Sequence, residues 1–294
     1  MKKSDKAKTF KERAKKFIPF WMQKKLYKIV KKVRHIKNVK SGKKITKQYL
    51  KKVFLQAGLK KGDVILLHSS LGRVGYIENG PDDIIDALLE IIGKEGLLVM
   101  PAFCEPEFDK NRELYVFNMQ NTPTYTGAIP ETFRKRLGVK RSISPTHSFS
   151  ALGMRADDFV KNHENCDNPF ALNGPFGKLY EWKAKMLLLG VDHLANSSLH
   201  IVEDMSDFPV KVFTPKFKAL VIDGKNEKII EARRHTAHSR KTRDPNIMEM
   251  YCLQYKVMKI FKIGNTELRV IDIKPFVEMM TKLYKKGITI YPEG

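Results

Sequence analysis

From residue 45 onward, apolar and polar positions form short blocks that predict alternating strands and helices. The run Val64–His68 is largely apolar, as buried strands are, and Pro81 stands at the first turn of an amphipathic pattern that continues to Ile92. Gly96 then precedes a second apolar run, Leu97–Met100. Because strand, helix and strand in this order are typical of parallel pairing, we predict an α/β fold with a mixed, largely parallel central sheet flanked by helices.

The remaining blocks extend this pattern to the end of the chain. Residues Ser69–Asn79 contain glycines and are expected to form a loop. Further strands are predicted at Lys185–Val191, Val210–Phe213 and Phe217–Ile222. Further helices are predicted at Ile45–Gly58, around Ile129–Arg136, after Asn196, around Ile247–Phe261 and at Lys274–Lys286.

Charge is distributed very unevenly along the chain. Residues 1–52 contain 21 Lys and Arg against Asp5 and Glu12, and so carry +19 of the net charge of +23. The rest of the chain is nearly neutral. We therefore divide the chain into a basic amphipathic arm, residues 1–44, and an enzyme domain, residues 45–294.

The arm has a helical spacing of apolar residues, with Phe10, Ala14, Phe17 and Trp21 three and four positions apart. One interpretation is a basic helix that lies on an anionic membrane surface through residues 1–52, and the other is a solvated appendage that packs a few aromatics on the enzyme domain. Nucleic-acid binding is disfavoured because no groove-reading or base-stacking motif follows.

The cysteines and the apolar runs indicate the cellular compartment in which the protein is expected. Cys104, Cys166 and Cys252 are widely spaced and predict neither a disulfide framework nor a zinc cluster. The apolar stretch Phe17–Met22 is too short for a signal segment or a membrane span. We therefore expect a cytoplasmic protein, with the arm as a candidate attachment to the inner membrane surface.

The first candidate for chemistry is the segment His68–Gly75, at the end of the first predicted strand, where open α/β sheets bind ligands. Its amides, its hydroxyls and Arg73 have the chemistry to hold a pyrophosphate. It matches neither GxGxxG nor a P-loop, which disfavours dinucleotide binding and nucleotide hydrolysis. An ordinary turn is the alternative interpretation.

The second candidate is Asn196–Glu203, which follows the predicted strand Lys185–Val191. Asn196 or Ser197 can cap a helix on which His200 and Glu203, three positions apart, face the same way. Histidine titrates near neutral pH, and a carboxylate beside it can support proton removal from an attacking amine. A helical histidine with a solvent-facing partner is the alternative.

The third candidate is the segment Arg141–Gly153, polar at its start and apolar at its end, in which His147 either lines a site or is a structural histidine. A zinc site is disfavoured because HExxH is absent and because the spacings of the candidate ligands do not fit; those candidates are His193, His200, His235 and His238. A serine nucleophile is disfavoured by the lack of GxSxG, and Cys104 is expected to be buried and inert.

In this order the three segments resemble the antibiotic N-acetyltransferase family, whose best known members are aminoglycoside 3-N-acetyltransferases. The likeness covers about residues 45–290. It runs through Leu67–Gly72, Gly96–Pro101, Thr122–Gly127, Phe133–Arg134, Arg141–Ser142 with Pro145 and Ser148, Gly174–Tyr180, Leu187–Val191 and Asn196–Glu203.

The resemblance implies the α/β fold of that family, acetyl-CoA as the donor and direct transfer of acetyl to an amine without a covalent intermediate. By position it makes His200 the general base and Glu203 its acidic companion. It assigns the cradle for the CoA phosphates and pantetheine to His68, Ser69, Ser70, Gly72 and Arg73. We place His147 and Asn196 on the acceptor side, and we expect no metal.

Two departures leave the acceptor open. Ser144 stands before Pro145, where some forms of the family have a histidine. The segment Glu231–Arg243 is rich in cations, which would oppose a polycationic aminoglycoside if they line the cleft and would have no effect if they form a distant exposed turn. The acceptor is thus an aminoglycoside or another amino sugar. The alternatives are a nucleotide-linked or lipid-linked amino sugar of surface polysaccharide synthesis, or a non-catalytic scaffold that docks on membranes.

Overall fold

The computed structural model describes residues 29, 30, 33, 44–205, 213–235 and 243–291. The chain divides into two units, Met1–Lys44 and Ile45–Gly294. The basic arm falls almost entirely outside the described residues, so its helix and its attachment to a membrane stay predictions. Within the described ranges, the helices are too short or too polar to cross a bilayer.

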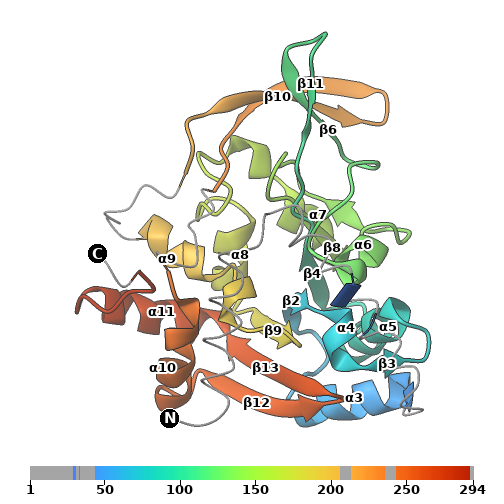
Figure 1. Ribbon diagram of the computed structural model, residues 1–294, viewed down its shortest axis with the longest axis vertical. Helices are drawn as coiled ribbons and strands as arrows, with labels where there is room; N and C mark the ends of the chain where they lie inside the picture. Colours follow the sequence, from blue (N-terminus) through green and yellow to red (C-terminus); the bar gives the residue numbers. More distant parts are fainter. Residues whose placement is uncertain (1–28, 31–32, 34–43, 206–212, 236–242, 292–294) are drawn as a thin grey trace. The chain divides into compact units, whose positions relative to one another are not determined.

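The main sheet has seven strands in the described part of the chain, in the order β12-β13-β9-β2-β4-β8-β7 (Figure 1). The strands are β2 (Val64–Ser69), β4 (Leu97–Pro101), β7 (Lys140–Arg141), β8 (Phe149–Gly153), β9 (Lys185–Leu189), β12 (Met258–Ile263) and β13 (Thr266–Asp272). The strands β2 and β4, joined through helix α5 (Pro81–Ile92), pair in parallel as predicted, and β2 also pairs in parallel with β9.

The prediction of a largely parallel sheet is wrong. The other four pairings in this sheet, β12 with β13, β13 with β9, β4 with β8 and β8 with β7, are antiparallel. A parallel pair needs a long crossover, whereas β12 and β13 are joined by the two-residue turn Gly264–Asn265, in which Gly264 has a φ of 53°. The α/β class is correct, and the sheet is mixed with a parallel centre.

The same hairpin corrects the prediction of one helix over Ile247–Phe261. Helix α10 covers Met248–Gln254, and the chain then turns at Lys256, whose φ is 56°, before it enters β12. Apolar residues in β12 are spaced as in a helix, but pairing with β13 stabilises the extended form. The predicted helix at the end of the chain is α11 (Ile273–Tyr284).

Both faces of the main sheet are covered, because alternate side chains of its strands enter different cores. Leu66 belongs to one core cluster, whereas Ile65 and Leu67 belong to the other. The cluster of Ile65 is closed by α3 (Lys47–Gln56), α5 and α6 (Ala128–Phe133). The cluster of Leu66 is closed by α7 (Ala156–Val160), α8 (Pro175–Glu181), α9 (Leu199–Met205), α10 and α11.

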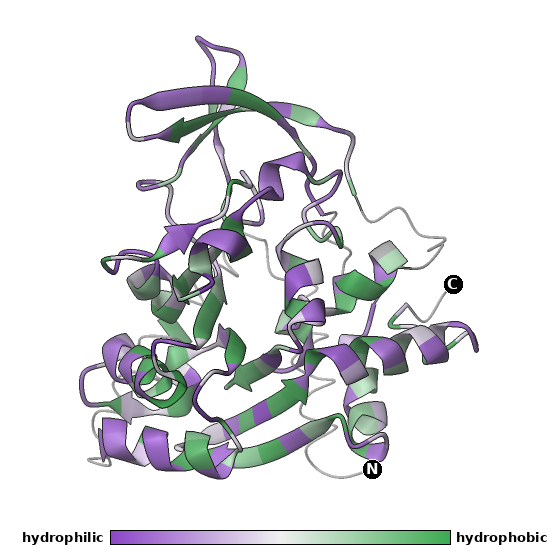
Figure 2. Cartoon of the chain, turned by 180° about the vertical axis from the view of Figure 1, so that it is seen from behind, coloured by the Kyte–Doolittle hydropathy of each residue, from purple (hydrophilic) through white to green (hydrophobic). Residues whose placement is uncertain are grey.

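A second sheet, absent from the predictions, has four strands among the described residues in the order β11-β10-β6-β5. These are β5 (Glu107–Asp109), β6 (Leu114–Asn118), β10 (Phe217–Asp223) and β11 (Asn226–Ala232). The hairpin of β10 and β11 carries both hydrophilic and hydrophobic segments (Figure 2), with Ala219–Val221 of β10 buried and much of β11 exposed. The predicted strand Phe217–Ile222 is confirmed as β10. Of Val210–Phe213, only Phe213 is described, and it bridges to His235.

The predicted loop Ser69–Asn79 contains two short elements, α4 (Leu71–Val74) and β3 (Tyr76–Ile77), and β3 pairs with β1 (Lys44–Ile45). Three 3-10 turns complete the description, at His163–Asn165, His193–Ala195 and Pro245–Ile247.

Candidate active site

A cavity of about 400 Å³ opens where the three parallel strands end. Residues that end or follow β2, β4 and β9 line it, among them Ser69, Pro101 and Val191. Ligands of open α/β sheets bind at this edge because strand ends and loops converge there. The second and third predicted segments also reach this cavity, since His147 and His200 line it.

His200 and Glu203 form a buried pair on α9. His200 Nδ1 lies 2.7 Å from Glu203 Oε2, as their spacing on a helix predicts. Burial alone would raise the pKa of Glu203. The adjacent His200 and His235 stabilise the charged carboxylate more strongly than burial disfavours it, so the pKa of Glu203 lies well below its usual value. An ionised carboxylate only accepts hydrogen bonds, so Nδ1 of His200 carries the hydrogen and Nε2 is left as the basic nitrogen.

Two further groups, which the sequence did not single out for this role, meet the same carboxylate. Tyr291 donates a hydrogen bond of 2.8 Å to Glu203 Oε1. His235 Nε2 lies 3.5 Å from Glu203 Oε2, and its ring centroid is 4.1 Å from that of His200. Burial, with the neighbouring His200, lowers the pKa of His235 to about 4, so it is neutral at pH 7.

His200, Glu203 and His235 offer donor atoms that lie within 4.8 Å of one another. Imidazole and carboxylate are also groups that bind zinc, so this trio has the composition to hold a cation. Of the four histidines considered for zinc, the structure brings His200 and His235 together, His193 is not part of the trio, and His238 lies outside the described residues.

Aromatic rings fix the orientation of the cavity histidines. Phe170 stacks on His200 with ring centroids 4.5 Å apart, and it meets His147 edge-on at 5.0 Å. His147 is buried, and its Nδ1 shares a hydrogen bond of 2.8 Å with Thr146 Oγ1. Burial, together with nearby His235, keeps the pKa of His147 well below its usual value. His147 therefore presents a neutral ring to the cavity.

The predicted donor cradle is only partly at the cavity. His68 and Ser69 line it, whereas Ser70, Gly72 and Arg73 are not among its described lining residues. His68 Nε2 lies 3.0 Å from Ser197 Oγ, and burial lowers the pKa of His68 to about 3. Ser70 precedes α4, and Arg73 in that short helix is exposed.

Asn196 lies at the cavity wall and also organises the turn before α9. Its Oδ1 accepts hydrogen bonds from the backbone N and the Oγ of Ser198, at 3.0 and 2.7 Å. Its Nδ2 lies 3.2 Å from Nδ1 of His193, which also lines the cavity. Nε2 of His193 is buried without a hydrogen-bond partner among the described residues.

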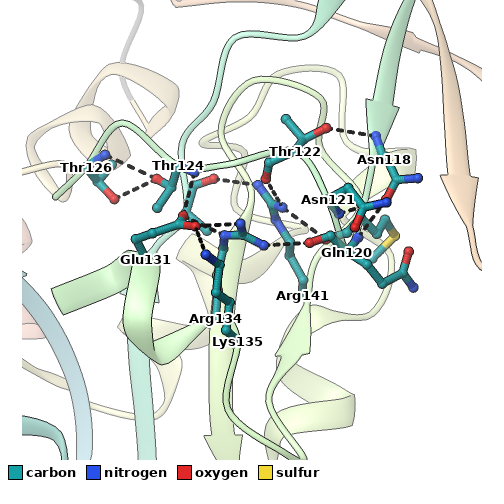
Figure 3. Close-up of polar contacts among 12 residues, drawn as sticks. Asn118, Gln120, Asn121, Thr122, Thr124, Thr126, Glu131, Arg134, Lys135 and Arg141 are labelled. Atoms are coloured by element: carbon teal, nitrogen blue, oxygen red, sulfur yellow. Dashed lines mark hydrogen bonds and ion pairs between the residues drawn. The ribbon is translucent and has the colours of Figure 1, made fainter. Parts of the chain in front are cut away.

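The chain between β6 and α6, whose polar contacts Figure 3 shows, contributes to the cavity wall. Tyr125 and Thr126 of this stretch line the cavity. Glu131 accepts from the backbone N of Thr124 at 3.0 Å and from two nitrogens of Arg134, at 2.6 Å each. Burial disfavours ionisation of Glu131, but these hydrogen bonds and that of Lys135 lower its pKa to about 2. The network fixes the loop that carries Tyr125.

The cationic segment Glu231–Arg243 is not a single free patch. Arg233 lies 3.6 Å from Asp167, and Arg234 lies 3.1 Å from Glu105. Arg243 lines the cavity. Arg240 and Lys241 lie outside the described residues. Of the two interpretations of this segment, Arg243 supports a cation at the cleft.

Cys104 is no nucleophile. Its thiol donates to the carbonyl of Pro145 at 3.2 Å, and burial raises its pKa to about 11. The thiol therefore stays protonated at pH 7, as expected of an inert buried cysteine.

Known proteins are similar to this chain in both sequence and fold. The family model described as aminoglycoside 3-N-acetyltransferase matches residues 66–285. An aminoglycoside N(3')-acetyltransferase-like protein of Bacillus subtilis, YokD, is 27% identical over 257 residues, which cover 81% of this chain and 92% of that protein.

Two solved structures are similar. The crystal structure of aminoglycoside acetyltransferase AAC(3)-Xa superposes with a TM-score of 0.76 at 23% identity, over 88% of this chain and 99% of that one. A complex of an AAC(3)-IVa variant with apramycin has a TM-score of 0.70 at 26% identity, over 85% of this chain and 96% of that one. The chain therefore belongs to the aminoglycoside 3-N-acetyltransferase family, whose members are acetyl-CoA-dependent N-acetyltransferases.

Proposed function

We propose that this enzyme transfers acetyl from acetyl-CoA to a primary amine of an aminoglycoside or another amino sugar, with His200 as general base. The observation that carries the proposal is the 2.7 Å hydrogen bond between His200 and Glu203 beside a cavity at the sheet edge. Glu203 holds the imidazole in the tautomer whose Nε2 is basic. Positioned bases of this kind accelerate proton transfer by about 10² to 10⁴.

The reaction is a direct acyl transfer. The amine nitrogen attacks the thioester carbonyl, the new C–N bond forms, and the C–S bond breaks to release the CoA thiol. Nε2 of His200 takes the proton that the amine loses and returns it to the leaving sulfur, so that the imidazole ends the cycle neutral. The positive charge that develops on the imidazole is stabilised by Glu203, 2.7 Å away on the other side of the ring.

The two substrates need different ends of the cavity. We place the thioester beside His68 and Ser69, because both line the cavity at the end of β2, and the CoA phosphates farther out, near Ser70, Gly72 and Arg73. The acceptor then lies beside His147 and Asn196. We also propose that the reaction needs no metal, since both oxygens of Glu203 already contact protein donors.

A second acceptor class is favoured by charge. Of the described residues that line the cavity, Arg243 is a cation and none is Asp or Glu. A polycationic drug needs carboxylates, whereas a nucleotide-linked or lipid-linked amino sugar has phosphates that a cation attracts. Such a sugar is the alternative acceptor.

A third interpretation is a scaffold that kept the fold without the chemistry. The intact pair of His200 and Glu203 argues against it. Deletion of residues 1–44 tests it, together with the division into an arm and an enzyme domain. If the chain is an enzyme, the truncated protein keeps its turnover of a soluble amine. If the chain is a scaffold, the truncated protein loses its association with anionic vesicles.

The test is thiol release from acetyl-CoA, run in parallel with aminoglycosides and with nucleotide-linked amino sugars. We expect His200→Ala to lower kcat by at least about 100-fold while the Kd for CoA stays within about threefold. His163→Gln is the matched control, because His163 is buried but bonded to Ser142 and Pro169 away from the cavity. Loss of CoA binding in His200→Ala would contradict the assignment of the base.

A further inference from the structure

The carboxylate of Glu203 is held from a part of the chain that lies beyond the family match. The match ends at residue 285, and Tyr291 is the last residue that the structure describes. Its hydroxyl donates to Glu203 Oε1 at 2.8 Å, whereas Oε2 accepts from His200 at 2.7 Å. Each carboxylate oxygen thus has its own short hydrogen bond, one to the base and one to the tyrosine.

The segment that carries Tyr291 is tied down locally. The backbone N of Tyr291 donates to Thr289 Oγ1 at 3.0 Å. The carbonyl of the preceding Ile290 accepts from the backbone N of Asp244 at 2.7 Å, which joins this segment to the stretch that carries the cavity residue Arg243. Tyr291 as a residue is 6% exposed and packs in the same core as Val202 of α9. Its hydroxyl therefore has little freedom to leave the carboxylate.

The chemistry of a buried carboxylate explains why this bond matters. A glutamate has three rotatable bonds, and a single hydrogen bond to His200 leaves the carboxylate free to turn about that contact. A second, rigid donor on the other oxygen removes this freedom. Burial and the charge of Glu203 raise the pKa of Tyr291 far above its usual value, so the phenol stays a donor.

We propose that Tyr291 is a positioning residue that acts on catalysis through Glu203: it fixes the carboxylate so that His200 keeps its Nδ1–H tautomer and its orientation toward the acceptor amine. This inference rests on the proposed role of His200 as base. It assigns a function to the C-terminal segment, which the family match does not include.

The kinetic test is Tyr291→Phe, which removes one oxygen and keeps the ring. We expect kcat to fall about tenfold with the KM of both substrates within about twofold, because the lost hydrogen bond is to a charged group and acts on the base, not on binding. In a Glu203→Gln background the same substitution should have no further effect on kcat, because the carboxylate through which Tyr291 acts is absent. Tyr251→Phe is the matched control, because Tyr251 packs against the same core and has no contact with Glu203 in the described structure.

A second measurement does not depend on turnover. The proton on His200 Nδ1, bonded to a carboxylate, should give a resolved downfield NMR signal that Glu203→Gln abolishes. Tyr291→Phe should shift or broaden this signal, and Tyr251→Phe should leave it unchanged. If Tyr291→Phe changed the signal but the wild-type protein released no thiol with any amine, the proposed function would fail, while the structural part of the inference, that Tyr291 fixes the carboxylate of Glu203, would stand.

Three outcomes would overturn the inference. They are an unchanged kcat and NMR signal in Tyr291→Phe, an equal loss of kcat in the wild-type and Glu203→Gln backgrounds, and a loss of kcat explained by unfolding in a thermal melt while the NMR signal of the folded fraction is unchanged.

Discussion

The imidazole of His68, at the end of β2, and the hydroxyl of Ser197, in the turn before α9, lie 3.0 Å apart although 129 positions separate them in the sequence. Both groups are buried at the cavity wall. Removing one partner leaves the other buried and unpaired, which costs about 1 to 3 kcal/mol. We therefore expect Ser197→Ala to lower the free energy of unfolding by about that amount, measured by urea denaturation at pH 7.5.

Ser150 provides the control for this prediction. Its hydroxyl is fully buried in β8 and has no hydrogen-bond partner among the described residues. Ser150→Ala removes a buried hydroxyl that makes no hydrogen bond in the described structure. The free energy of unfolding of this variant should therefore be unchanged or higher. Equal destabilisation by both substitutions would mean that the bond between His68 and Ser197 contributes nothing.

Arg141 joins the chain that leads out of the second sheet to the main sheet. Its guanidinium donates to the carbonyls of Met119, Thr122 and Ala102 at 3.0, 2.7 and 3.1 Å, and it lies 4.8 Å from the ring centroid of Phe117. A lysine cannot reproduce this planar fan of donors. Arg141→Lys should therefore lower the free energy of unfolding by about 2 to 4 kcal/mol.

The matched substitution is Arg155→Lys. Arg155 is exposed and lies over the ring of Trp182 at 5.1 Å. We expect its free energy of unfolding to change by less than about 0.5 kcal/mol. Both substitutions keep the positive charge, so a loss in Arg155→Lys as large as that in Arg141→Lys would contradict the assignment of the effect to the fan of hydrogen bonds.

Buried neutral histidines make the stability of the fold dependent on pH. Burial lowers the pKa of His68 to about 3 and those of His163, His193 and His235 to about 4, each from 6.5. Below pH 6.5 the unfolded chain binds protons that the folded chain does not, so stability is complete above pH 6.5 and is lost as the pH falls toward 4. Each such histidine contributes a slope of up to about 1.4 kcal/mol per pH unit.

His163→Gln isolates one of these contributions, because His163 lies outside the cavity lining. The free energy of unfolding is measured by urea denaturation at pH 7.5, 6.0 and 5.0. It should fall less steeply with decreasing pH in this variant than in the wild-type protein, and the slopes should differ by up to about 1.4 kcal/mol per pH unit, the contribution of one proton. Parallel curves for the two proteins would show that His163 is protonated in the folded state.

Chelation tests the expectation that the reaction needs no metal. Dialysis against a strong chelator should leave kcat unchanged, because Glu203 is satisfied by His200 and Tyr291 without an ion. Added zinc should inhibit, because the trio of His200, Glu203 and His235 has the donors to bind it. Elemental analysis of the purified enzyme is the accompanying measurement. Loss of activity that zinc restores would overturn the expectation.

Local features were predicted well. The unit of β2, α5 and β4 follows from one apolar run, one proline-initiated amphipathic stretch and a second apolar run, each read from neighbouring residues. The strand directions elsewhere were not predicted, because direction depends on how a connection crosses the sheet and not on the strand's own composition. The second sheet was missed for a related reason, since β6 and β10 come from distant parts of the chain.

The sequence by itself determined the family, through motifs in a fixed order, and the pairing of His200 with Glu203, because a spacing of three on a helix places two side chains on one face. Only the tertiary structure decided what else meets that carboxylate. Tyr291 is 88 positions from Glu203, and His235 follows β11, a strand of the other sheet. Their meeting is set by the paths of loops and by packing against a common core, which no local pattern of residues encodes.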